Sequence, residues 1–382
     1  MSAVQRVVEF ADARRSLRAP AAVAWRRGCS MSLPSAVYIT RTNLGADWIS
    51  PHANVYLKPL EVARTHALTL CVPRTAQVPP ELASRCARLV RYDSLRGLRK
   101  RLLRETSART ELFTGFDFPC LWLARKLKRR RGCPWTVFLW DPPSLGHRDA
   151  FPPLRRAIDF VWRMLAPAAD RLVLNIHPGL LGEMRYRPPR GQKLEFRMQD
   201  AFTERKPAKI ASASGCLYDF GVLSNWTAAK GGPLLSEALA RLPGLKGLWI
   251  GSPPAHSAAE GIRFTGRLPQ TEAFARLRTC RVLIVPYLPV PSLKWNYPLK
   301  LFEYLQLGRP VVASDNPGNA AVAARHPRCV RLFKSGDAAS LAAVLKEVLA
   351  ESSSLDVPTP LQHPVLAKLP VLSGILGFPW CD

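Results

Sequence analysis

The sequence is poor in acidic residues and contains no long apolar run. Its longest apolar candidate, residues 369–380, carries two prolines and is shorter than the ~20 residues that a membrane-spanning helix needs. There is no CxxC pair, and nine scattered cysteines in 382 residues favour free thiols in a reducing compartment over a disulfide framework or a zinc site. We therefore expect no metal site, no cofactor and a cytoplasmic location.

Positive charge is abundant instead. The chain has 55 Lys and Arg against 28 Asp and Glu, a net charge of +27, and 47% of its residues are apolar. The apolar content predicts a globular protein, and the charge predicts an anionic partner: a nucleotide, a lipid headgroup or nucleic acid. Residues 96–131 hold twelve Lys and Arg against three acids, with leucines interleaved. This pattern is typical of a helix that lies on an anionic membrane, or of a solvated helix face.

Composition divides the chain into five parts. Residues 1–34 carry six arginines and lack the apolar stretch of a signal peptide, so we expect a basic, disordered leader, with either Met1 or Met31 as the true start. Two domains are expected at 35–200 and 216–357, separated by a polar linker at 201–215. A proline-rich tail follows at 358–382.

Short apolar runs alternate with helical stretches in both domains. Strands are expected at 36–40, 67–72, 87–92, 135–140, 171–176, 194–198, 216–223, 245–251, 262–266, 281–286, 310–314 and 329–333. Helices are expected at 54–65, 95–111, 119–131, 152–166, 231–242, 270–279, 298–307, 317–325 and 337–351. This alternation predicts an α/β protein with two doubly wound, Rossmann-like parallel sheets facing a cleft. Ligands of such sheets bind beyond the carboxyl ends of the strands.

The expected helix at 298–307 carries an unusual pair of charges. Pro298 suits its first position and Gly308 its end, and its many apolar residues predict burial. Lys300 and Glu303 nevertheless lie three residues apart on one face. Either Glu303 accepts the hydroxyls of a ribose, with Lys300 holding it or reaching a phosphate, or the two form an internal ion pair.

Two loops at the same end of the second sheet also suit a nucleotide. In 221–233, Ser224 offers a hydroxyl, and Lys230 and Gly231 precede a helix start, which favours an anion. In 265–277, Gly266 lets the backbone approach a flat ligand, with Arg267 beside it. An ordinary strand-to-helix loop is the alternative at each position.

The first half offers candidates for the acceptor side. Gly45 lies in the loop after the first strand, where a backbone amide can meet a diphosphate or an acceptor. Asp141 ends the strand at 135–140 and is the preferred acid or base, although a turn aspartate is the alternative.

The stretch 296–318 resembles the nucleotide-sugar motif of the GT-B glycosyltransferases, especially family 4. Eight positions match its form P-x-K-x-x-E-Y-x-x-x-G-x-P-V-V: Pro298, Lys300, Glu303, Tyr304, Gly308, Pro310, Val311 and Val312. The loop at 221–233 resembles the family's diphosphate loop, which makes Lys230 the diphosphate lysine. The resemblance covers about 216–351 and is only architectural over 36–198.

The resemblance implies a hexosyltransferase-like enzyme of polysaccharide biosynthesis. It implies a nucleotide diphosphate-sugar donor, a glycan or lipid-linked acceptor, retention of configuration, and a cytoplasmic enzyme that is peripheral on the inner face of the membrane. Two alternatives remain open: a GT-B sugar-nucleotide epimerase, and a non-enzymatic protein that binds a polyanion. Nucleic acid is not the expected partner, because no helix-turn-helix or aromatic–basic single-strand motif is present.

The sequence departs from the family's pattern in two loops and in its tail. Val222 stands where relatives often carry an arginine, and Trp295 stands where many carry a second glutamate. The tail at 358–382 does not resemble the family's final helix. With Val222 in place of the arginine, Lys230 has no second cation in its loop to bind the diphosphate. With Trp295 in place of the glutamate, retention of configuration is less strongly implied.

Overall fold

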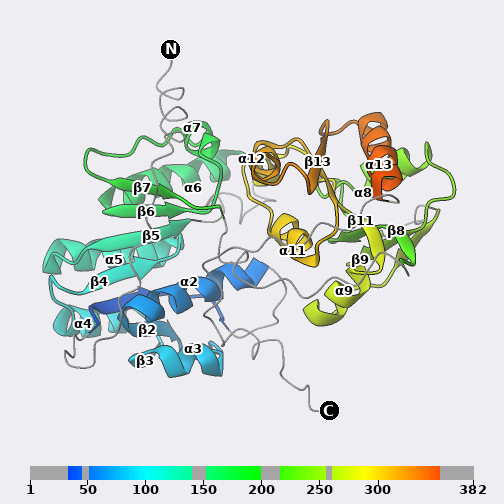
Figure 1. Ribbon diagram of the computed structural model, residues 1–382. Helices are drawn as coiled ribbons and strands as arrows, with labels where there is room; N and C mark the ends of the chain where they lie inside the picture. Colours follow the sequence, from blue (N-terminus) through cyan, green and yellow to red (C-terminus); the bar gives the residue numbers. More distant parts are fainter. Residues whose placement is uncertain (1–32, 45–50, 140–151, 199–215, 255–259, 353–382) are drawn as a thin grey trace, which may run out of the picture. The chain divides into compact units, whose positions relative to one another are not determined.

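The computed structural model describes residues 33–44, 51–139, 152–198, 216–254 and 260–352. Within these ranges the chain forms two parallel β-sheets with helices between the strands (Figure 1). None of the helices in the described ranges is long and apolar enough to cross a membrane.

The first sheet has seven strands in the order β3-β2-β1-β4-β5-β6-β7, and every neighbouring pair is parallel. Its strands are β1 (Ser35–Ile39), β2 (Ala67–Pro73), β3 (Arg88–Tyr92), β4 (Glu111–Thr114), β5 (Trp135–Leu139), β6 (Arg171–Leu174) and β7 (Lys193–Phe196). Its helices are α2 (Pro51–Thr65), α3 (Pro80–Arg85), α4 (Leu95–Glu105), α5 (Phe118–Arg131), α6 (Pro152–Leu165) and α7 (Gly179–Glu183).

Alternating side chains place an apolar layer on each face of this sheet. On one face Val37, Ile39 and Val137 pack with residues of α4, α5, α6 and α7. On the other face Tyr38 and Phe138 pack with residues of α2 and α3. Because both faces of a parallel sheet are covered by crossover helices, its strands read as continuous apolar runs.

Local signals set the limits of the helices on the first of these faces. Ser94 accepts a hydrogen bond from the Gly97 amide at 3.1 Å and begins α4. Gly132 adopts a left-handed conformation, with φ of 69°, and ends α5.

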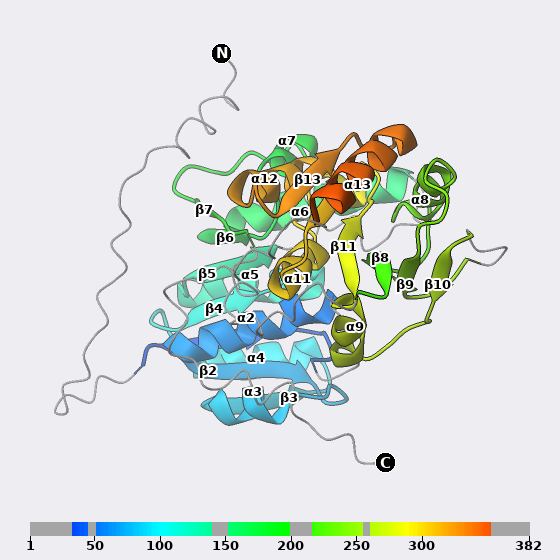
Figure 2. The same cartoon turned by 45° about the vertical axis from the view of Figure 1, so that its right-hand side comes forward.

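The second sheet has six parallel strands in the order β10-β9-β8-β11-β12-β13. Its strands are β8 (Tyr218–Leu223), β9 (Gly247–Ile250), β10 (Ile262–Phe264), β11 (Cys280–Val285), β12 (Val311–Ser314) and β13 (Val330–Phe333). Its helices are α8 (Gly232–Leu239), α9 (Gln270–Leu277), α10 (Pro291–Lys294), α11 (Leu299–Leu307), α12 (Pro317–Arg325) and α13 (Ala338–Ser352). In Figure 2 the strands β11, β8, β9 and β10 follow one another across this sheet.

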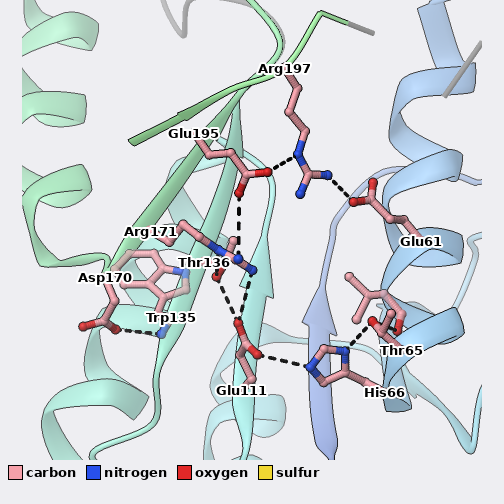
Figure 3. A network of polar contacts seen from close by, with 11 residues as sticks. Glu61, Thr65, His66, Glu111, Trp135, Thr136, Asp170, Arg171, Glu195 and Arg197 are labelled. Atoms are coloured by element: carbon pink, nitrogen blue, oxygen red, sulfur yellow. Dashed lines mark hydrogen bonds and ion pairs between the residues drawn. The ribbon is translucent and has the colours of Figure 1, made fainter. Parts of the chain in front are cut away.

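A polar network ties α2 to the first sheet (Figure 3). It alternates acids and bases across neighbouring strands: Glu61, Arg197, Glu195, Arg171, Glu111 and His66. Arg171 lies 3.8 Å from Glu195 and 3.6 Å from Glu111. Glu61 and His66 belong to α2 and the residue after it, so the network fixes the carboxyl-terminal end of this helix against β4, β6 and β7.

Both expected doubly wound sheets are confirmed, with corrections in the first half. The helix expected at 95–111 ends at Glu105, because the short strand β4 follows at Glu111–Thr114. The sequence did not predict β4 or the short helices α3 and α7. In the second half all six strands and all five expected helices are present. Within its described residues, the one-turn helix α10 is the only helix that the sequence did not predict.

Candidate functional site

The carboxyl edge of the second sheet contains a topological switch point. From β8 the chain proceeds outward through β9 to β10, and from β11 it proceeds the other way through β12 to β13. The strands β8 and β11 are neighbours, so the loops that leave them diverge. Crevices in open α/β sheets form at such points and bind ligands.

The loop after β8 packs closely on the loop after β11. The Leu288 amide donates to the Ala229 carbonyl at 3.0 Å. Gly231 has a φ of 78°, and a Cβ there would lie 1.9 Å from the Pro286 carbonyl oxygen. Only glycine fits this position, because both its backbone conformation and the space around it exclude a side chain. The glycine expected before the helix thus brings the two loops together.

Lys230 directly precedes this turn at the start of α8. Its backbone amide donates to the carbonyl and the hydroxyl oxygen of Thr227, at 3.2 Å each. Its ammonium nitrogen lies over the ring of Tyr287, 4.0 Å from the ring centre. The expected lysine therefore lies at the switch point, between the ends of β8 and β11.

The loops after β8, β9 and β10 meet through their backbones. The Gly251 amide donates to the Gly266 carbonyl at 2.8 Å, and the Trp249 indole donates to the Ser224 carbonyl at 2.5 Å. A Cβ at Gly266 would have no heavy atom within 4 Å, so its backbone is open to a flat ligand. Arg267 next to it is exposed. The structure thus brings Ser224, Gly266 and Arg267 to one edge.

Helix α11 carries the pair of charges expected from the sequence. Lys300 Nζ lies 3.0 Å from Glu303 Oε2, and the side chain of Glu303 is only 1% exposed, against 17% for Lys300. Pro298 occupies the N-cap position, one residue before the expected start, and Gly308 ends the helix with a φ of 68°. The expected ion pair between Lys300 and Glu303 is therefore present. A buried carboxylate beside a partly exposed lysine also suits a ligand with hydroxyl and phosphate groups.

Tyr304 ties this helix to the end of β8. The Leu223 amide donates to the Tyr304 hydroxyl at 2.6 Å, and Tyr304 is fully buried. Burial raises the pKa of this phenol well above its usual range, so it stays neutral. The sequence matched Tyr304 to a motif without assigning it a role; the structure shows that it positions α11.

Trp295 precedes α11 and lies against residues that follow β6. Its ring stacks on His177 with the ring centres 5.3 Å apart, and its indole N–H donates to Glu183. The neighbouring Lys294 lies 3.6 Å from the same carboxylate. A tryptophan at this position therefore makes packing and hydrogen-bond contacts in place of the charge that many relatives have.

The switch point of the first sheet lies between β1 and β4. Here Arg41 Nη1 lies 3.3 Å from Asp117 Oδ1, just beyond the ends of these strands. Gly45 and Asp141, expected on the same side, lie outside the described residues. Their assignments stay predictions.

Lys58 in α2 is a buried cation that no sequence pattern singled out. Its side chain is 6% exposed and lies 3.3 Å from Glu61, and its ammonium is 5.4 Å from the ring centre of Phe138. Burial lowers the pKa of Lys58 below its usual value, although the Glu61 carboxylate opposes the shift. A lysine in an amphipathic helix reads as a surface residue, so only the fold reveals its burial.

Comparison with known proteins supports the assignment of the second half. Residues 219–351 match the family model described as Glycosyl transferases group 1. The matched region includes the loop at 221–233, the loop at Gly266 and the whole of α11. This part of the chain is therefore similar to the group 1 glycosyltransferases. No curated protein matches the chain.

Solved structures extend the likeness to both sheets. HepE from Anabaena in complex with UDP has a TM-score of 0.60 at 14% identity, over 85% of this chain and 92% of HepE. A trehalose 6-phosphate synthase from Burkholderia multivorans has a TM-score of 0.56 at 14% identity, over 85% and 93%. The lipopolysaccharide galactosyltransferase WaaB has a TM-score of 0.54 at 13% identity, over 83% and 90%. The GT-B fold expected from the sequence is confirmed.

Proposed function

We propose that this chain transfers a sugar from a nucleotide diphosphate-sugar to a glycan or lipid-linked acceptor, with UDP as the nucleotide. The observation that carries the proposal is α11, where a buried glutamate and a partly exposed lysine follow the family's motif. Support for uridine comes from the crystal structures of HepE, one with UDP and one with UDP-glucose.

Glu303 and Lys300 are the residues proposed to bind the nucleoside. A carboxylate accepts hydrogen bonds from both hydroxyls of a ribose, and the Lys300 ammonium lies 3.0 Å from the buried Glu303 carboxylate. Pro298 fixes the start of the helix, and the open backbone at Gly266 suits the face of a base.

Lys230 and the start of α8 are proposed to bind the diphosphate. The Lys230 ammonium and the positive end of the α8 helix dipole attract negative charge, and Gly231 lets the loop approach β11. Negative charge on the diphosphate grows as the sugar leaves, so these groups stabilise the transition state more than the ground state. Gly45, Ser224 and Arg267 are proposed as further donor contacts.

The stereochemistry decides the role of Asp141. If configuration is retained, a departing phosphate oxygen takes the proton of the acceptor and no protein base is required. If configuration is inverted, a base must take that proton, and Asp141 is the proposed residue. We propose retention, on the strength of the motif in α11.

We propose that the acceptor is presented at a membrane surface. Residues 96–131 carry a large surplus of Lys and Arg, and we propose that the enzyme is cytoplasmic and meets a lipid-linked acceptor at an anionic inner surface.

A thermal-shift panel tests the donor. UDP and UDP-sugars are expected to raise the melting temperature in a concentration-dependent manner, whereas matched guanosine and adenosine diphosphates are not. The sugar nucleotide that stabilises best is then assayed for UDP release with and without glycan and lipid-linked acceptors. Stabilisation by no nucleotide contradicts the proposal, and conversion of the UDP-sugar without any acceptor identifies an epimerase instead.

A further inference from the structure

Helix α6 exposes a row of apolar side chains that nothing in the described chain covers. Leu154, Phe160, Val161 and Met164 are each between 40% and 57% exposed. They recur at the three- and four-residue spacing of one helix face, while Ile158, Trp162 and Leu165 face the core. Around the helix the exposed row adjoins the buried one, and Arg156, Asp159 and Arg163 occupy the remaining side. The apolar side of α6 is therefore wider than the part that the core covers, and its uncovered part is suited to contact with something other than water.

The helices beside α6 carry the opposite chemistry. Helix α5 packs between α4 and α6 on one face of the first sheet, so the outer sides of the three form one surface (Figure 1). Their sequences hold fourteen Lys and Arg, five in α4, six in α5 and three in α6, against the two acids Glu105 and Asp159. Glu105 is already paired with Arg88 and Arg101.

A hollow between α4 and α5 concentrates these cations. It has a volume of about 430 Å³ and is lined by Arg99, Leu103, Lys126, Arg129 and Arg130. The Nε atom of Arg99 is buried without a hydrogen-bond partner. Desolvation and the charges of Arg99 and Arg130 lower the pKa of Lys126, as expected where positive charge is not balanced.

Trp122 connects the basic and apolar parts. It lies on the outer side of α5, 47% exposed, and the Lys126 ammonium is 3.5 Å from its ring centre. Exposed tryptophan with lysine beside it is the combination found where proteins meet the headgroup region of a bilayer.

We propose that the outer side of α4, α5 and α6 binds the surface of an anionic lipid bilayer, with the α6 row inserted among the acyl chains and the hollow at Arg99 holding a lipid phosphate. The cations of α4 and α5 and the apolar row of α6 are both satisfied only by an anionic bilayer. A nucleic acid neutralises the cations but leaves the α6 row in water, and an apolar protein partner leaves the cations unbalanced. The inference deepens the proposed membrane contact of residues 96–131 and adds α6 to it.

The test measures lipid binding without turnover, so its failure leaves the transferase proposal standing. The full chain is sedimented with phosphatidylcholine vesicles, with and without phosphatidylglycerol, at low and at high salt. Binding is expected to require phosphatidylglycerol and to weaken in high salt. Equal binding to both kinds of vesicle overturns the proposal.

Two double variants separate the two parts of the surface. Phe160→Ser with Met164→Ser is expected to lower partitioning into anionic vesicles at least about tenfold, because two apolar side chains leave the bilayer. Its control, Leu33→Ser with Leu217→Ser, removes two exposed leucines from elsewhere and is expected to bind normally. Arg129→Glu with Arg130→Glu is expected to lower partitioning by at least about tenfold as well.

The charge variant also has a matched control. Arg241→Glu with Lys246→Glu changes the net charge equally at two exposed cations of the second half, and is expected to retain binding. All substituted side chains are exposed, so melting temperatures are expected to stay near that of the wild type. Unchanged vesicle binding by the α6 variant overturns the proposal, and DNA binding lost only in the Arg129 and Arg130 variant then identifies a nucleic-acid surface.

Discussion

The ammonium of Lys230 lies over the ring of Tyr287, 4.0 Å from its centre, and so joins the loop after β8 to the loop after β11. A cation–π contact of this kind is worth about 0.5–2 kcal/mol. That is enough to orient the lysine toward the switch point, yet weaker than its attraction to a diphosphate in a site without water. The lysine is therefore held ready for its proposed ligand.

Lys230→Ala is expected to impair turnover more than nucleoside recognition. Losing one group that stabilises growing phosphate charge costs roughly 2–4 kcal/mol in the transition state. The measurements are kcat/KM for the UDP-sugar and the affinity for UMP. The control is Lys246→Ala, at an exposed lysine that precedes β9 at the opposite edge of the sheet. Turnover within about threefold of the wild type, below 1 kcal/mol, excludes Lys230 as the phosphate ligand.

Glu303→Gln is expected to weaken UDP binding by about 1.5–3 kcal/mol, because a charged acceptor of the ribose hydroxyls is replaced by a neutral one. Calorimetry gives the affinity, and the melting temperature shows whether the fold survives. Glu351→Gln is the control, since Glu351 is ion-paired to Arg331 at 3.4 Å and 39% exposed. Unchanged UDP affinity in Glu303→Gln leaves the carboxylate as an internal ion-pair partner only.

Gly231→Ala is expected to destabilise the protein far more than Gly244→Ala. Both glycines have a positive φ, of 78° and 87°, which costs another residue about 1–2 kcal/mol. Only Gly231 has a backbone oxygen 1.9 Å from the new Cβ, whereas Gly244 has no heavy atom within 4 Å. The overpacking adds about 1–3 kcal/mol. Equal melting temperatures for the two variants are incompatible with the tight contact between the loops.

The network around Glu61 predicts a dependence of stability on pH. Burial opposes ionisation of Glu61, but Lys58 and Arg197 outweigh it and hold its pKa below the usual 4.5. The unfolded chain then binds a proton more readily than the folded one, so the stabilisation is present above pH ~4.5 and is lost as the pH falls through the folded-state pKa. Urea unfolding is expected to show Glu61→Gln less stable than the wild type at pH 7, with the difference shrinking in acid. A difference that is constant with pH excludes this assignment.

The sequence predicted the second half well because its signals are local and agree with each other. Gly308 ends α11 in the left-handed conformation that its position implied, and Lys300 and Glu303 pair as their spacing implied. Lys230 and Gly231 lie at the switch point because the strand order of such sheets is regular.

The first half was less predictable for physical reasons that particular residues illustrate. The strand β4 has only four residues, which is too short for a clear alternating pattern in the sequence. The predicted helix therefore extended from the basic helix α4 as far as Glu111. Asp117, which begins α5 just after β4, pairs with Arg41, 76 residues away. Contacts at that separation depend on the packing of the whole sheet and leave no local pattern.

The hydrogen bond from Leu223 to Tyr304 makes one amide a reporter of the whole site. This N–H ends β8 and donates to a buried phenol that belongs to α11 and directly follows Glu303. Its deuterium exchange is expected to require α11 to leave the end of β8, and the nucleotide proposed to bind Glu303 is expected to make that departure rarer. The deuterium exchange rate of the Leu223 amide is thus expected to measure the fraction of protein with bound donor. The measurement requires no turnover and can be made in the presence of any acceptor.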